Sequence, residues 1–284
     1  MSTPHEPTSR RLAIGAGAAL GAAALLGTSG CSSSSPAGAP RADATTASEP
    51  PTAAATTPSD TLSPPAATPT ATPTGDPRPS VAAIRGPDIV HGPRSRDEVA
   101  LTFHGQGAAS FTDAVLLACR AASAAVTVFA VGTWVQGGPD QALALQRDGH
   151  ELGNHTWSHQ PMRRLSASAA RTEVRKGRDE LAQAIGDAGW WFRPSGTPHS
   201  TATIRSAAWA AGYARCVSYD VDPQDYLDPG AAAVRSRVRR AVRAGSIVSL
   251  HLGHAGTAEA LPGILSDLAA AGLQPVTLSR LLRD

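Results

Sequence analysis

Short runs rich in β-branched and aromatic residues alternate with stretches whose apolar residues recur every three or four positions, from about residue 97 to the end of the chain. The short runs predict strands, and the wider spacing predicts amphipathic helices. Strand and helix alternating about seven times predicts a parallel α/β sheet with covering helices, either open and doubly wound or closed into a barrel. The expected strands are 99–104, 126–132, 150–154, 190–194, 214–220, 246–252 and 274–278, and the expected helices are 111–125, 140–149, 166–189, 200–212, 230–245 and 257–272.

The first part of the chain has no such pattern. Residues 1–31 are typical of an export signal, because Arg10 and Arg11 precede an uncharged Ala/Gly/Leu run, as in twin-arginine signals. Small residues before Cys31 resemble a lipobox, although Thr28 stands where leucine is usual. We therefore expect an exported protein that is held at the outer face of the membrane by a lipidated Cys31, or is secreted if the signal is simply removed.

Residues 32–80 consist mainly of Ser, Thr, Ala and Pro, with Leu62 as the only large aliphatic residue. Such a segment cannot bury enough apolar surface to offset its ordering entropy. It is predicted to be a disordered tether, which leaves residues 81–284 as the folded domain.

Composition excludes some partners. A net charge of +2, with scattered arginines, gives no indication of nucleic-acid binding. Cys119 lies in a helical pattern and Cys216 in a strand-like one, so we expect two buried thiols rather than a disulfide. We expect a monomer.

Polar residues gather where the expected strands end, which is the edge at which parallel α/β folds build their active sites. His155 and His159 are four residues apart, a spacing that would place both imidazoles on one face of a helix, within reach of one metal ion. Zinc needs at least one more protein ligand. The other polar residues at strand ends are His104, Asn154, Arg193, Asp220, Asp222 and His251.

Five motifs in order resemble those of the polysaccharide deacetylase family, the NodB-type domain of carbohydrate esterase family 4. They are "ALTF" at 100–103, "HTWSH" at 155–159, "FRPSG" at 192–196, "DPQDY" with Asp225 and Tyr226, and "SLH" ending at His251. The resemblance covers roughly residues 85–284. It implies a distorted (β/α)7 barrel that uses a divalent metal, zinc above all, to remove acetyl groups from an acetylated polysaccharide.

The first motif departs from the family pattern. There the strand runs into two aspartates, the first a general base and the second a metal ligand, whereas this chain has His104 and Gly105. Ser249 also replaces a leucine of the family's acetyl pocket. The family arginine pairs with the base aspartate, but Arg193 would face His104 and disfavour its protonated form.

Two interpretations of His104 follow. In the first, His104 completes a three-histidine zinc site with His155 and His159 that keeps a position for water, and the protein is a hydrolase that is slower for lack of a base. In the second, the site is derelict, and the protein is an inactive glycan-binding pseudoenzyme. A surface scaffold lipoprotein is a third hypothesis, which the cluster at the strand ends disfavours.

The resemblance also assigns roles within the hydrolase interpretation. His251, oriented by Asp225, would protonate the leaving amine, and the backbone amide of Gly196 would help to hold the oxyanion. Tyr226 is the best candidate for stacking on a sugar ring. Together with Arg193 and His104, these residues form the expected catalytic and substrate-binding set.

Overall fold

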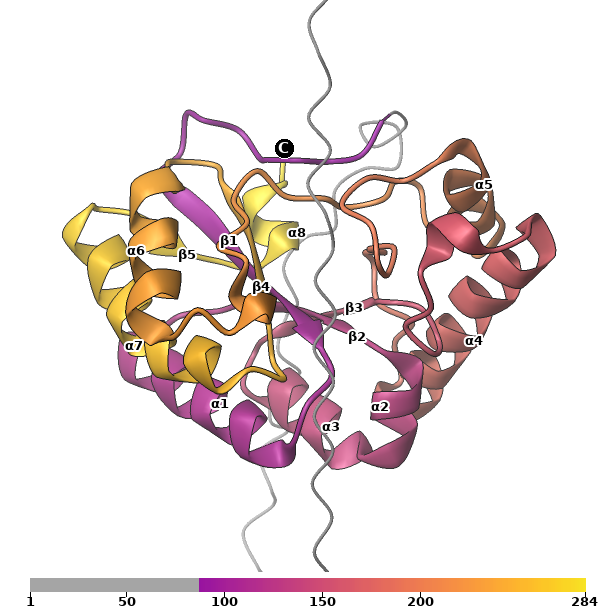
Figure 1. Cartoon of the computed structure of the whole chain (residues 1–284), viewed down its shortest axis with the longest axis horizontal. Coiled ribbons are helices and arrows are strands. Elements are labelled where there is room, and N and C mark those ends of the chain that lie inside the picture. Colours follow the sequence, from indigo (N-terminus) through magenta and orange to yellow (C-terminus); the bar gives the residue numbers. More distant parts are fainter. Residues whose placement is uncertain (1–86) are drawn as a thin grey trace, which may run out of the picture. The chain divides into compact units, whose positions relative to one another are not determined.

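The computed structural model describes residues 87–284, which contain strands surrounded by helices (Figure 1). The predicted export signal, Cys31 and the predicted tether lie outside the described residues. No helix within residues 87–284 is both long and apolar enough to cross a membrane.

The sheet is parallel and centres on the strand that carries the first motif. Its strand order is β3-β2-β1-β4, and the short β5 pairs with the first residues of β1. The register places His104 beside His251 across the β1–β4 pair. The strands are β1 (Glu98–Gly105), β2 (Thr127–Ala130), β3 (Glu151–Asn154), β4 (Ile247–His251) and β5 (Gln274–Pro275).

Single backbone bridges continue the sheet beyond β3 and β4. Phe192 bridges Asn154 on one side and Cys216 on the other, and Val221 bridges Val248 of β4. The segment from Cys216 to Val221 thereby connects the two edges of the sheet. The fold is the distorted (β/α)7 barrel that the resemblance implied.

Two of the expected strands are much shorter than the sequence predicted. Segments 190–194 and 214–220 contribute only these single bridges to the sheet. Pro194 has no amide to donate to a longer ladder. The backbone of 216–218 divides its hydrogen bonds between Ile89 and Phe192, so neither pairing extends.

The helices pack on one another around the strands in the order α5, α4, α3, α1, α7 and α6. α4 begins where the Ser166 hydroxyl accepts a hydrogen bond from the amide of Ala169, and it ends at Gly186 with a left-handed φ of 75°. The short α2 lies partly where the sequence predicted strand. The helices are α1 (Ala109–Ala122), α2 (Gly132–Gly137), α3 (Pro139–Arg147), α4 (Ala167–Ile185), α5 (Ala202–Ala210), α6 (Ala231–Ala241), α7 (Ala255–Ala270) and α8 (Leu278–Leu281).

Apolar side chains fill the space between the strands and the helices. Leu101 and Phe103 of β1 pack into one buried cluster with side chains of α1 and α7, and Trp191 lies in a second. Cys119 and Cys216 are free, buried thiols, as expected. Burial raises the pKa of each to about 12, so neither is a nucleophile near neutral pH.

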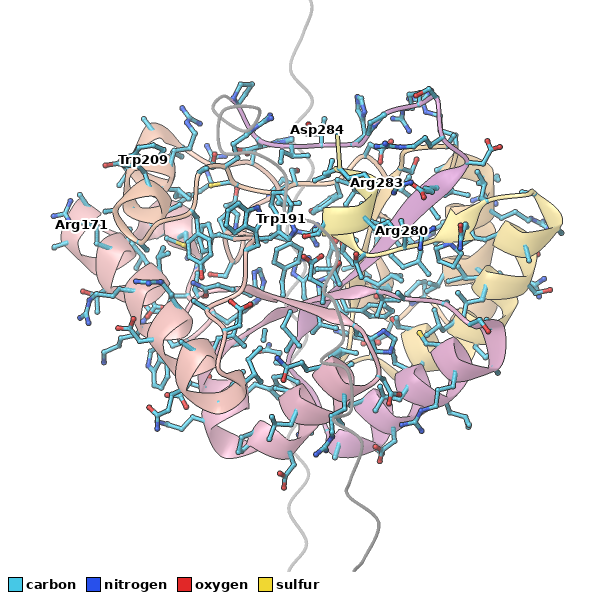
Figure 2. The ribbon with its side chains drawn as sticks, turned by 180° about the vertical axis from the view of Figure 1, so that it is seen from behind. Arg171, Trp191, Trp209, Arg280, Arg283 and Asp284 are labelled. Atoms are coloured by element: carbon cyan, nitrogen blue, oxygen red, sulfur yellow. The ribbon has the colours of Figure 1, made fainter. Side chains whose placement is uncertain are left out.

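A buried carboxylate at the first residue of β1 binds two arginines of the C-terminal segment. Glu98, in β1, accepts two hydrogen bonds of 2.8 Å from Arg283 and one of 3.3 Å from Arg280. Arg280 and Arg283 lie close to the C-terminal Asp284 (Figure 2). Burial alone would raise the pKa of Glu98, but the hydrogen bonds and charges of these arginines lower it below its ordinary value.

We therefore expect Glu98→Gln to weaken the acid dependence of stability. Because the folded state holds the Glu98 pKa below that of the unfolded chain, the unfolded chain binds more protons as the pH falls below about 5, and the free energy of unfolding decreases there. The variant should lose about 1–2 kcal/mol at pH 7 and show a flatter acid limb in urea denaturation between about pH 3 and 7. Asp179→Asn, which breaks an exposed pair with Arg175, should match the parent, and an equal loss in both variants would contradict the assignment.

Candidate active site

The loop that carries His155 and His159 follows β3 and contains no helix, so the predicted shared helical face is wrong. Thr156 and His159 instead adopt left-handed backbone conformations, with φ of 71° and 57°. This turns the chain so that the two imidazole rings approach to 5.0 Å between centroids. A β-branched residue such as Thr156 rarely adopts this conformation, which is sustained only where its surroundings enforce it.

Neighbouring elements hold the loop in this form. The first amides of α2, from Gly132 and Thr133, donate to the carbonyls of Thr156 and Trp157, both at 2.9 Å. Asn154 accepts from the amide of Thr156 at 2.8 Å and donates to the Val174 carbonyl of α4. Hydrogen bonds from α2, α4 and β3 thus stabilise the strained backbone of the loop.

The α4 side of the loop depends on a close approach at Gly177. A Cβ atom placed there would lie 2.5 Å from Oδ1 of Asn154 and 2.6 Å from the carbonyl oxygen of Thr156. On the same side, the buried Glu173 accepts from the amide of Ser158 at 2.9 Å and from its hydroxyl at 2.7 Å. Sequence reasoning missed both residues, because a helical pattern does not show which loop a helix touches.

Three imidazoles converge at the carboxyl ends of β1 and β3. Ligand nitrogens of His104, His155 and His159 all lie within 4.8 Å of one another. Nδ1 of His155 lies 2.8 Å from the carbonyl oxygen of Arg193. Since a carbonyl only accepts, the proton is on Nδ1, and the lone pair of Nε2 points into the cluster.

His104 meets this lone pair with Nδ1, at 3.0 Å. Its Nε2 lies 3.1 Å from the Ser249 hydroxyl and 3.4 Å from Nη1 of Arg193. The ring also stacks on His251 at 4.2 Å. Two departures from the family pattern, His104 and Ser249, are therefore bonded to each other.

The three imidazoles are held neutral. Burial, followed by the charges of His155, His251 and Arg193, lowers the pKa of His104 well below its ordinary value. Burial and the neighbouring His159 do the same to the pKa of His155, and burial lowers that of His159. Neutral imidazole is the form that binds a metal ion.

Arg193 is a buried cation whose hydrogen-bond partners are neutral. It donates to the Thr102 hydroxyl at 2.8 Å and to the Ser218 carbonyl at 3.0 Å, and its guanidinium carbon lies 4.2 Å from the centroid of the Phe129 ring. Burial lowers its pKa to about 9. Because His104 stands in place of the family aspartate, the charge of Arg193 disfavours the protonated form of this imidazole.

Gly105 leaves no room for the missing aspartate. A Cβ atom at this position would lie 2.7 Å from Cγ1 of Val128 and 3.1 Å from Cα of Ala130, both in β2. Position 105 therefore offers no metal ligand, as the sequence indicated.

Asp225 and His251 form a hydrogen-bonded pair beside the cluster. Asp225 Oδ1 lies 2.8 Å from Nδ1 of His251, and Oδ2 accepts from the His251 amide at 2.7 Å and from the Thr257 hydroxyl at 2.6 Å. Burial alone would raise the pKa of Asp225, but the hydrogen bonds and charge of His251 and the bond from Thr257 lower it. The ionised carboxylate fixes the proton of His251 on Nδ1 and leaves Nε2 free for proton transfer.

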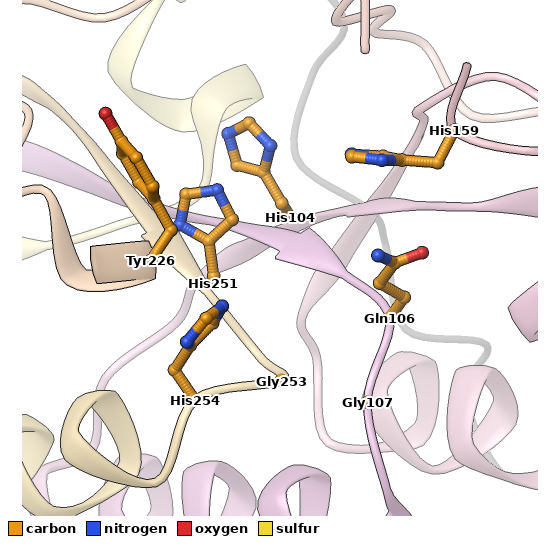
Figure 3. Close-up of a pocket in the computed structure, with 8 residues that line it drawn as sticks. All are labelled: His104, Gln106, Gly107, His159, Tyr226, His251, Gly253 and His254. Atoms are coloured by element: carbon orange, nitrogen blue, oxygen red, sulfur yellow. The ribbon is translucent and has the colours of Figure 1, made fainter. Parts of the chain in front are cut away.

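These groups open onto a pocket of about 570 Å³. Tyr226, His251 and His254 lie on one side and Gln106 and His159 on the other, with His104 between them (Figure 3). Tyr226 is 43% exposed and meets His251 edge to face at 5.4 Å. No carboxylate is among the described residues that line the pocket: His104, Gln106, Gly107, His159, Tyr226, His251, Gly253 and His254.

Three other sequence candidates lie elsewhere. Asp220 accepts from Arg94 and from the Ile247 amide, and Asp222 accepts from the Gln224 amide, so both act in loop structure. Gly196 lies against Pro161 and does not line the pocket. Its expected part in holding the oxyanion remains a prediction.

Comparison with known proteins agrees with this geometry. A family model described as polysaccharide deacetylase matches residues 91–215. The chain is 31% identical over 195 residues to a peptidoglycan-N-acetylglucosamine deacetylase of Bacillus cereus, and the match covers 67% of this chain and 91% of the relative. The chain belongs to the polysaccharide deacetylase family.

Solved structures have the same fold. A family 4 carbohydrate esterase from Streptomyces lividans, in complex with acetate, has a TM-score of 0.58 and 29% identity, and the match covers 63% of this chain and 91% of that one. A family 4 pseudoenzyme from Bacillus anthracis has a TM-score of 0.65 and 23% identity, and the match covers 69% and 70% of the two chains. The second likeness shows the fold alone.

We expect Gly177→Ala to distort the histidine loop, because the new methyl group would overlap Asn154 and Thr156. The variant should lose about 1–3 kcal/mol of stability, as overpacked sites do, and metal binding by the three histidines should weaken. Gly137→Ala is the matched control, since a Cβ atom placed at Gly137 would have nothing within 4 Å. Denaturation and zinc calorimetry of both variants would measure the effects, and parent-like behaviour of Gly177→Ala would show that α4 does not constrain the loop.

Proposed function

We propose that this protein is an exported, metal-dependent hydrolase that removes acetyl groups from an N-acetylated hexosamine polysaccharide of the cell-wall or chitin-like kind. The observation that carries the proposal is the convergence of three neutral imidazoles next to a His–Asp pair at one pocket. Family membership and the acetylated peptidoglycan named for the Bacillus cereus relative support the substrate class.

The donor set fits a divalent cation. Nε2 of His155 carries no proton, because its other ring nitrogen donates to a backbone carbonyl, and lowered pKa values keep all three rings neutral. Three imidazoles suit zinc best among the common biological divalent ions. A zinc ion held by His104, His155 and His159 would polarise the acetyl carbonyl and lower the pKa of a water molecule.

The protein's own groups would act around the bound acetamide. Nε2 of His251, oriented by Asp225, would take up the proton released by the attacking water and pass it to the leaving nitrogen. The exposed ring of Tyr226 would pack on the face of the sugar. Burial, together with the charges of the neighbouring histidines and of Arg193, would keep His104 unprotonated.

The site lacks one aid to catalysis that its family resemblance implies. The described pocket lining contains no carboxylate to serve as base, and Nε2 of His104 points to Ser249 and Arg193. Since general acid–base assistance contributes on the order of a hundred-fold or more, we expect a slow enzyme.

The same observations favour a second candidate, a glycan-binding protein without turnover. In the described arrangement Nδ1 of His104 donates a hydrogen bond to Nε2 of His155, so the lone pair that would bind a metal ion is already in use. If no metal displaces this bond, the pocket would bind a glycan and leave it intact.

We also propose that residues 1–31 export the chain, that Cys31 is lipidated, and that residues 32–80 tether the domain at the cell surface. Mass spectrometry of the mature N-terminus tests this, because an unprocessed Met1 or an unmodified Cys31 would contradict export or lipidation.

Zinc titration by calorimetry of the full chain tests the metal site. We expect one site in the parent, and affinity lowered at least about 10-fold in His104→Ala, because a ligand is lost. Ser249→Ala should lower the zinc affinity about 10-fold. If His104 binds zinc through Nδ1, its proton moves to Nε2, which then needs the Ser249 hydroxyl oxygen as a hydrogen-bond acceptor. Ser218→Ala, which removes a buried hydroxyl bonded to Pro198, should bind like the parent. Absence of binding in the parent would rule out the metal mechanism.

Acetate release from N-acetylated glycan tests the hydrolase. The parent with zinc should release acetate, and His251→Ala and Asp225→Asn should each reduce kcat about 100-fold or more, because the proton donor is lost or misoriented. His199→Ala, an exposed histidine outside the pocket, should be unaffected. Zinc binding without acetate release would favour the glycan-binding candidate.

A further inference from the structure

A second His–Asp pair lies beside the first. His254 follows His251 by three residues, as Asp228 follows Asp225. In both pairs Nδ1 of the histidine lies 2.8 Å from Oδ1 of the aspartate. The proposed chemistry uses the first pair and leaves the second without a role.

His254 lines the pocket. Its side chain is 26% exposed and its ring lies 5.8 Å from that of His251, on the side of Tyr226 (Figure 3). Because the Asp228 carboxylate only accepts, the proton is on Nδ1, and Nε2 is left to bond a ligand.

Gln106 lies across the pocket from His254. The loops that carry the two residues meet at their backbones: a Cβ atom on Gly107 would lie 2.8 Å from Cα of Gly253, and one on Gly253 would lie 2.9 Å from the Gln106 carbonyl oxygen. This contact brings the backbones of the two loops together on either side of the pocket. Two polar side chains beside an exposed aromatic ring are typical of a sugar-binding site.

We propose that His254, held by Asp228, binds the sugar unit next to the one that loses its acetyl group, and that Gln106 bonds the same unit from the opposite side. The ligand class is a neutral amino-sugar oligomer of at least two units, whose hydroxyl groups both donate and accept hydrogen bonds. The proposal rests on the proposed function, because it takes the deacetylated sugar to lie at His251.

The alternative is that the pair only fastens the Asp225–Leu227 turn to the start of α7. A structural role of that kind would alter every substrate alike. A binding role would alter only substrates that reach His254, and mainly their KM.

Steady-state kinetics on the zinc-loaded full chain separate these roles. We compare a tetramer of N-acetylglucosamine with 4-nitrophenyl acetate, which has no sugar, in the parent, His254→Ala, Asp228→Asn and the control His199→Ala. His254→Ala should raise KM for the tetramer about 3–10-fold with kcat within about two-fold, since one hydrogen bond is lost, and should leave the ester kinetics unchanged. Asp228→Asn should act in the same direction and more weakly. An unchanged KM for the tetramer, or an equal loss on both substrates, would overturn the proposal.

Calorimetric binding of the same tetramer keeps this inference separate from the proposed function. If the parent releases no acetate, the hydrolase proposal fails, but a tetramer Kd that weakens about 3–10-fold in His254→Ala would still support the binding role. A Kd equal to that of the parent, or no binding by the parent, would overturn it.

Discussion

The site depends on one buried guanidinium that has no carboxylate partner within residues 87–284. Arg193 is surrounded by a hydroxyl, carbonyl groups and aromatic rings, and burial lowers its pKa to about 9. Burial is the largest cause of the lowered pKa of both His104 and His155. Arg193 adds a charge that lowers the pKa of His104 further and a carbonyl that fixes the tautomer of His155.

Much of this arrangement could be predicted from the sequence. Alternating periods gave the parallel α/β architecture, and polar residues at strand ends gave the edge where His104, His155 and His251 meet. Motif resemblance gave the pairing of Asp225 with His251. These features rest on local patterns along the chain, and they can be predicted even when the element boundaries are misplaced by a few residues.

The parts that failed depend on contacts between distant segments. Spacing alone suggested a helix for His155 and His159, but α2 and α4 hold a strained loop there instead. The segment around Cys216 had strand-like residues, yet its backbone bonds are shared between two neighbours. His254 had only the sequence pattern of an ordinary loop residue, because its partner, Asp228, is 26 positions away.

Two departures from the family pattern are in contact with each other. His104 and Ser249 are hydrogen-bonded to each other, His104 also reaches His155, and Asp225 holds His251 beside them. Hydrogen bonds therefore connect the two substituted positions to the motif residues around them.

The packing at Gly105 bears on how this site can change. A side chain there would strike Val128, a stiff β-branched residue buried in β2. An aspartate at position 105 would therefore also need a shift or a substitution in the neighbouring strand. Placing the family's metal ligand in this chain is in this sense a matter of at least two positions, 105 and 128, rather than one.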